Sequence, residues 1–172
     1  EPLEILRNNK SITTQFCLCW ANENWTRAWD GLDKEVLIAQ QHSPEDDLSF
    51  IIYISKYLKD PRYIRLDEKP LLIVYRPSLL PNPKKTMEVW RNWCRKNGIG
   101  ELIIGVCHSF TTQPPGDFGC DLAIEFAPIN MNLRKLSPQD LGCPTDFSGG
   151  IYDWQSMLER SDEYTPPGYP LA

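Results

Sequence analysis

The sequence has 172 residues, with 18 Lys and Arg against 23 Asp and Glu, which gives a formal net charge of -5. Hydrophobic residues make up 41% and charged residues 24%, as in an ordinary globular chain. The acidic balance and the absence of a basic block argue against nucleic acid or an anionic membrane as partner. No apolar run in the sequence approaches the roughly 20 residues that a transmembrane helix needs, so no transmembrane segment is expected.

The first half of the sequence predicts a short helix, a buried strand and a longer helix. Residues 2–9 have the pattern of the last turns of a helix, and the apolar run 16–20 is short enough to be a buried strand. Residues 36–39 form a second short apolar piece. Ser43 then has the character of an N-cap, because Pro44 and three acidic residues follow it at the start of a helix of roughly 14 residues.

The second half alternates strands and helices. The expected elements, in chain order, are a strand at 71–75, a helix at 86–97, strands at 102–106 and 122–126, a loop at 130–150 and a helix at 153–163. Such alternation predicts an α/β fold in which parallel strands are joined by crossover connections.

The polar stretch that follows the first strand is the clearest candidate site. Ligand sites of α/β proteins lie at the carboxyl ends of strands, and indole, amide, carboxylate and guanidinium groups together suit a sugar. The candidate substrate-binding residues here are Trp20, Asn22, Asn24, Trp25 and Arg27, with Glu23 as a candidate catalytic carboxylate. The alternative is a capped turn with two indoles folded into the core.

Three further candidate residues lie at the carboxyl ends of the later predicted strands. Arg76 is either a substrate contact or part of a structural ion pair, and His108 is either a substrate contact or a buried, satisfied histidine. Glu125 is unusual within an apolar strand, so it should face a polar cavity or pair with a residue such as Arg76. If Glu125 is desolvated, a raised pKa would suit it to general-acid catalysis.

The cysteines and histidines do not predict a metal or a cofactor. Six cysteines lack zinc-ligand spacing, and the two histidines lie far apart in the sequence. Reduced, mostly buried thiols in the cytoplasm are the favoured interpretation, with disulfides in a secreted protein as the alternative. A small nucleotide-binding domain is disfavoured because no glycine-rich phosphate motif is present.

Several long motifs resemble one known family. The segments FCLCWANENWTRAWDG, PEDDLSFI, DPRYIRLDEKPLLIVYRPSLLP and LAIEFAPI are similar to the WbsX-type glycosyltransferase family, which is grouped with domains like glycoside hydrolase family 99. The resemblance covers nearly the whole chain. One departure is Ala28, where a second arginine is expected after Arg27.

The resemblance implies a fold and a function. It implies a partial (β/α)8 TIM-type barrel, roughly strands three to six, in which residues 1–172 form a single incomplete domain. The chain starts at Glu1 without an initiator methionine, so the rest of the barrel is expected from flanking sequence. The Asn-Glu-Trp-x-Glu-Gly motif that supplies carboxylates in the related hydrolases is absent, and residues 22–25 are not that motif.

The implied activity concerns glycosidic bonds. The family is associated with bacterial polysaccharide and O-antigen biosynthesis, so the expected substrate is a carbohydrate or a sugar nucleotide, handled by transfer or by hydrolysis. Glycosidases commonly use two carboxyl groups, and Glu23 and Glu125 are the hypothetical pair. If the missing strands carry the acid and base, these two residues only position substrate and the fragment alone is inactive. A non-catalytic carbohydrate-binding domain is the alternative.

Overall fold

The computed structural model describes residues 2–126 and 133–172, in two compact units. One unit comprises Glu1–Glu125 with Tyr169–Ala172, and the other comprises Phe126–Gly168. That residues 1–172 make one incomplete domain stays a prediction.

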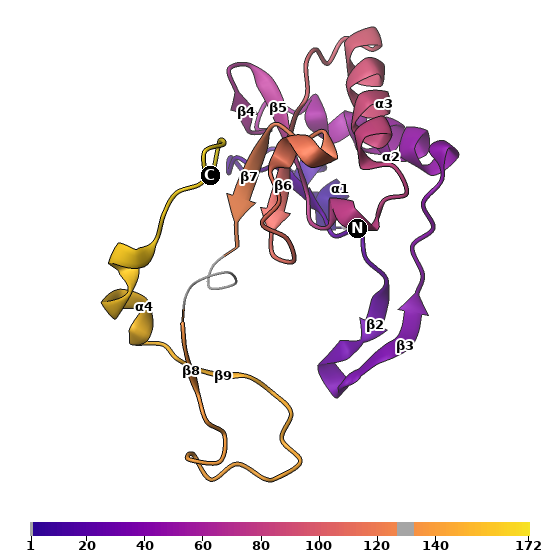
Figure 1. Cartoon of the computed structure of the whole chain (residues 1–172). Helices are drawn as coiled ribbons and strands as arrows, with labels where there is room; N and C mark the ends of the chain where they lie inside the picture. Colours follow the sequence, from indigo (N-terminus) through magenta and orange to yellow (C-terminus); the bar gives the residue numbers. More distant parts are fainter. Residues whose placement is uncertain (1, 127–132) are drawn as a thin grey trace. The chain divides into compact units, whose positions relative to one another are not determined.

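A parallel sheet forms the centre of the first unit. Its strands are β1 (Leu18–Trp20), β5 (Lys69–Val74), β6 (Ile103–His108) and β7 (Leu122–Glu125), in the spatial order β1-β5-β6-β7. All three pairings along this path are parallel. Figure 1 shows β5, β6 and β7 side by side. The predicted α/β class with parallel strands is therefore confirmed.

Three helices accompany the sheet, and two of them cover it. They are α1 (Pro2–Asn8), α2 (Pro44–Leu58) and α3 (Pro83–Lys96). Alternate residues of the strands, such as Leu72 and Val74, share one hydrophobic core with Ile51 of α2 and Trp90 of α3. Because successive strand residues point to opposite faces, Cys19 and Ile73 lie on the other face of the sheet.

Side-chain caps fix where α2 and α3 begin. The hydroxyl of Ser43 accepts from the backbone N–H of Asp46, as the sequence predicts, and Pro44 follows at the first helical position. Asn82 caps α3 by accepting from the N–H of Lys85, so this helix begins three residues before the predicted start at residue 86.

Two short antiparallel pairs interrupt the parallel pattern. β4 (Arg65–Leu66) pairs with the start of β5 through a turn in which Asp67 and Glu68 have φ of 47° and 63°. β2 (Trp25–Arg27) and β3 (Leu32–Ile38) form a hairpin closed by the 3-10 turn η1 (Ala28–Asp30). The sequence predicted only residues 36–39 of this region as extended, so the hairpin is longer than expected and includes two residues assigned to the polar site, Trp25 and Arg27.

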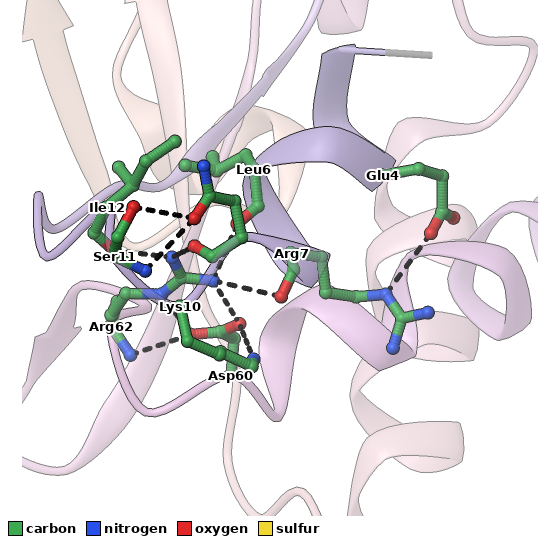
Figure 2. A network of polar contacts seen from close by, with 9 residues as sticks. Glu4, Leu6, Arg7, Lys10, Ser11, Ile12, Asp60 and Arg62 are labelled. Atoms are coloured by element: carbon green, nitrogen blue, oxygen red, sulfur yellow. Dashed lines mark hydrogen bonds and ion pairs between the residues drawn. The ribbon is translucent and has the colours of Figure 1, made fainter.

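A network of polar contacts around Arg62 connects the end of α1 to the segment before β4 (Figure 2). The guanidinium of Arg62 bonds both carboxylate oxygens of Asp60, at 2.9 and 2.8 Å. It also donates to the backbone carbonyls of Leu6 and Ile12, at 2.9 and 2.7 Å. Arginine thus satisfies carbonyls left open at a helix end, and holds the pKa of the buried Asp60 carboxyl well below its usual range.

The end of the chain returns to the sheet. The backbone of Ala172 donates to the carbonyl of Ala123 and accepts from the N–H of Glu125, both at 2.9 Å. Leu171 forms a parallel bridge with Ala123, so residues 170–172 run along the outer edge of β7. None of the helices among the described residues is long and apolar enough to cross a membrane.

The second unit differs from the sequence prediction. It contains the antiparallel pair β8 (Arg134–Leu136) and β9 (Ile151–Asp153), a single helical turn α4 (Ser156–Glu159), and the 3-10 turn η4 (Ser161–Glu163). The predicted helix at 153–163 is wrong, because its first residue belongs to a strand and the remainder is broken into two short turns. Residues 130–132 of the predicted loop lie outside the described residues.

Candidate active site

The carboxyl ends of the parallel strands bring several predicted site residues to one edge of the sheet. Asn22 and Glu23 follow β1, Arg76 follows β5, and His108 and Glu125 are the last residues of β6 and β7. The register pairs His108 directly with Glu125. Parallel strands end on the same side of a sheet, so the position of these residues agrees with the sequence prediction.

Asn22 joins β1 to β5 beyond their last ladder pair. Its side-chain amide donates to the carbonyl of Arg76 and accepts from the N–H of the same residue, both at 2.8 Å. The residue is completely buried. The amide therefore continues the strand pairing, and both of its polar groups are used within the protein.

Glu23 and Arg76 form an ion pair at this junction. Arg76 Nη1 donates to Glu23 Oε2 at 2.8 Å, and both side chains are partly exposed. The guanidinium also stacks on Phe110, with its central carbon 4.0 Å from the ring centroid. The sequence suggested Glu125 as a partner for Arg76, and this suggestion is wrong because Arg76 pairs with Glu23.

A shallow pocket lies beside the ion pair, between the end of β1 and the base of the hairpin. It has a volume of about 300 Å³ and is lined by Ala21, Glu23, Trp25, Ile38 and Gln40. This volume is at the lower end of the range for small-molecule sites. The lining combines a carboxylate and an amide with an indole and an aliphatic side chain, which suits the polar edge and apolar face of a sugar ring.

The hairpin presents two indoles to solvent. Trp25 is 63% and Trp29 is 65% exposed, and their rings meet edge to face at 6.4 Å between centroids. Asn24, directly before β2, accepts at Oδ1 from the backbone N–H of Gln40 at 2.7 Å. Arg27 pairs with Glu35 of β3 at 3.0 Å. Asn24 and Arg27 thus support the hairpin that carries the exposed indoles.

Trp20 is separate from this surface. Its indole stacks on Phe50 at 4.4 Å between centroids and meets Trp90 edge to face at 5.7 Å. These partners belong to α2 and α3, so Trp20 lies on the helix-covered face of the sheet. Of the two indoles predicted as sugar contacts, only Trp25 lines the pocket.

His108 and Glu125 have contrasting surroundings. His108 is buried, with Nε2 at 3.2 Å from the carbonyl oxygen of Gln113 and its ring edge-on to Tyr169. This environment matches one of the two alternatives that the sequence left open, a buried histidine whose ring nitrogen has a hydrogen-bond partner. Glu125 is exposed, so the desolvation that would favour it as a general acid is absent.

All six cysteines are free thiols. Two of them lie close together on the face of the sheet opposite the helices, with Cys19 Sγ 4.0 Å from Cys107 Sγ. The hydrogen bond between them lowers the pKa of Cys19 and, together with burial, raises that of Cys107. Within the part of the chain that the structure describes, no three His, Cys, Asp or Glu side chains cluster as metal ligands would.

Several residues at the site were not predicted from the sequence. They are Trp29, Ile38, Gln40, Ser109 and Phe110. Asp30 and Gly31, a turn between two segments rich in aromatic and β-branched residues, were the available signal for the hairpin that carries Trp29 and Ile38 and leads into Gln40. Ser109 and Phe110 follow β6 directly and could have been included by position alone.

Comparison with known proteins agrees with the resemblance in the sequence. The profile of the family described as Glycosyltransferase WbsX matches residues 1–167. Two curated proteins, both titled Uncharacterized protein WxcX, come from Xanthomonas campestris pv. campestris strains B100 and ATCC 33913. Each is 45% identical over 170 residues, which cover 99% of this chain and 24% of the relative. No solved structure is detectably similar. The chain thus spans about a quarter of the length of these relatives, and it belongs to the WbsX glycosyltransferase family.

Proposed function

We propose that the edge formed by Glu23, Arg76 and the β2–β3 hairpin is a sugar site that acts on glycosidic bonds. The observation that carries this proposal is the Glu23–Arg76 ion pair beside a pocket with an exposed indole, at the carboxyl ends of parallel strands. Membership of the WbsX family supports glycosyl transfer in bacterial polysaccharide biosynthesis, including that of O-antigen, as the reaction.

The side chains suggest distinct roles within this site. Glu23 is the candidate catalytic carboxylate, because it lines the pocket and faces the ion-pair partner that holds its orientation. Trp25 would stack on the apolar face of a pyranose ring. Asn24 and Arg27 would bind hydroxyl groups at the rim, and Arg76 would bind hydroxyl groups or a donor phosphate. Substrates are accordingly a carbohydrate or a sugar nucleotide.

The strand faces argue that Glu23 and Glu125 do not act as a close pair. Glu125 shares a face of β7 with Ala123, which belongs to the core beneath the helices, whereas Glu23 lines the pocket beside the hairpin. Two catalytic carboxyl groups face each other roughly 5–9.5 Å apart in glycosidases. We therefore assign catalysis to Glu23, keep Glu125 and His108 as flanking contacts, and expect a second catalytic group from outside this chain.

The wider fold that we propose is a (β/α)8 barrel similar to domains of glycoside hydrolase family 99. Every strand of the main path pairs in parallel with the next, and residues 170–172 continue this pattern beyond β7. The sheet face opposite the helices, which carries Cys19, would line the barrel interior. The described strands would then be roughly the third to the sixth.

The test uses the longest natural protein that contains these residues. We would measure nucleotide release from a panel of nucleoside-diphosphate sugars by the wild type and by Glu23→Gln. Glu101→Gln is the matched control, because Glu101 also pairs with an arginine but lies before β6, at the opposite end of the strands. The proposal expects a rate loss of about 100-fold or more for Glu23→Gln and none for Glu101→Gln.

A non-catalytic carbohydrate-binding role is the second candidate. The exposed Trp25 and Trp29 rings favour it, because they offer stacking surface without any catalytic group. Equal rates in Glu23→Gln and wild type would refute catalysis by Glu23. Sugar binding without turnover in the longest protein would establish the binding role instead.

A further inference from the structure

The guanidinium of Arg76 uses only part of its hydrogen-bonding capacity. Nη1 donates to Glu23, but Nε is buried and has no hydrogen-bond partner among the described residues. A buried donor on a cation that lacks a partner is costly, and native proteins rarely keep one without a reason. The unsatisfied Nε therefore marks a position where a partner is missing.

A second unsatisfied group lies at the end of the neighbouring strand. Ser109 is 4% exposed, and its Oγ is also buried without a partner among the described residues. Val74 of β5 is paired with Val106 of β6. Arg76 lies two residues after Val74, and Ser109 lies three residues after Val106. Two unsatisfied donors thus lie just beyond the carboxyl ends of the adjacent strands β5 and β6.

The side chain of Phe110 covers the guanidinium. Its ring stacks on Arg76 at 4.0 Å and meets Tyr75 edge to face, yet the residue itself is 58% exposed. A ring stacked on a guanidinium covers its face, whereas the Nε–H points outward in the guanidinium plane. Phe110 therefore orients the Nε edge of Arg76 without blocking it.

We propose that Arg76 Nε and Ser109 Oγ form an oxyanion subsite, in which the stacked ring of Phe110 holds the guanidinium in place. The inference rests on the proposed function and deepens it, by adding Ser109 and by naming an oxyanion as the substrate group that the Nε edge of Arg76 binds. With Glu23 holding Nη1, the Nε edge of the guanidinium remains for two parallel bonds to an oxyanion, a geometry that lysine cannot supply. The oxyanion is either a phosphate group of a nucleotide sugar or the carboxylate of an acidic sugar.

The test is calorimetric titration of the 172-residue chain with inorganic pyrophosphate and, separately, with D-glucuronate. Arg76→Lys keeps the positive charge and should weaken binding about tenfold, because the paired bonds are lost. Phe110→Ala should weaken binding about threefold, since the guanidinium loses the stacked ring that orients it. The matched control is Arg95→Lys, at the exposed pair with Glu101, which should bind as the wild type does.

Nitrogen NMR of arginine side chains gives a second readout that needs no variant. The oxyanion should shift the Arg76 Nε–H resonance in a saturable way, because this donor gains a hydrogen-bond partner only when the anion is bound. Binding of pyrophosphate alone would identify a phosphate site, and binding of glucuronate alone would identify an acidic-sugar site.

Two results would overturn the inference. One is equal binding by Arg76→Lys and wild type, and the other is no binding of either anion. If neutral sugars still shift the Trp25 indole resonance in that case, the oxyanion subsite is wrong and the proposed sugar site stands. If neither anions nor sugars bind, the proposed function fails as well.

Discussion

Replacing Asn22 by alanine should separate the ends of β1 and β5. The side chain makes two hydrogen bonds of 2.8 Å to the backbone of Arg76, and it is completely buried. Alanine would leave the N–H and the carbonyl of Arg76 without partners. Each unsatisfied buried group costs about 1–3 kcal/mol, so with some water entry the expected loss of stability is about 3 kcal/mol.

Urea unfolding of the 172-residue chain, followed by tryptophan fluorescence, measures this loss. The matched control is Asn24→Ala, two residues along the chain, where the amide is exposed and accepts one bond from Gln40. That variant should lose less than about 1 kcal/mol. A loss below about 1 kcal/mol for Asn22→Ala would refute the role of this amide in joining the strands.

The variant Asn22→Asp tests the same role through the pH dependence of its stability. An ionised carboxylate can accept from the N–H of Arg76 but cannot donate to its carbonyl, whereas a protonated carboxyl can do both. Folding should therefore raise the pKa of the introduced carboxyl above its unfolded value of about 3.9. The stability of this variant relative to wild type should then fall as pH rises from about 4 to 7, and pH-independent destabilisation would contradict the account.

Three further predictions concern other parts of the first unit. Asp60→Asn should lower stability by about 3 kcal/mol at pH 7, because Arg62 loses a buried partner. The folded pKa of Asp60 is depressed, so its stabilisation is complete above the unfolded pKa of about 4, and the difference should shrink progressively in urea melts as pH falls below that value. Tyr63→Phe should cost about 1–3 kcal/mol in the same assay, since the hydroxyl bridges backbone groups of β1 and β5 at 3.1 and 2.8 Å; a neutral result would contradict the bridge. Iodoacetamide should alkylate Cys19 before the other cysteines, as mass spectrometry would show, because Cys19 is exposed and its bond with Cys107 lowers its pKa; faster reaction of a buried thiol would oppose this.

The parallel sheet was predictable because its strands are continuous apolar runs separated by helical patterns. Leu71 to Val74 and Ile103 to Val106 have no competing interpretation of similar length. The hairpin was harder to predict from the sequence, because Trp25, Thr26 and Arg27 suit both a strand and a polar site. Sequence spacing alone does not separate these two, and in the structure the residues form β2 while Trp25 also lines the pocket.

Pairing at the site depended on the order of the strands. Both Glu23 and Glu125 end strands, so either could have been the partner of Arg76 by sequence. The sheet decides between them, because β1 lies next to β5 whereas β6 separates β5 from β7. Likewise, Trp20 faces the helices because it alternates with Cys19, and this assignment requires knowing which face the helices cover.

The most direct test of the sugar site is indole NMR during a sugar titration. The 172-residue chain, labelled with nitrogen-15, would be titrated with neutral monosaccharides and with nucleotide sugars. The account predicts that the indole signals of Trp25 and Trp29 shift in a saturable way, that buried Trp90 stays unchanged, and that Glu23→Gln weakens the effect. Unchanged Trp25 and Trp29 signals with every sugar, or equal shifts at Trp90, would contradict a sugar site at this edge of the sheet.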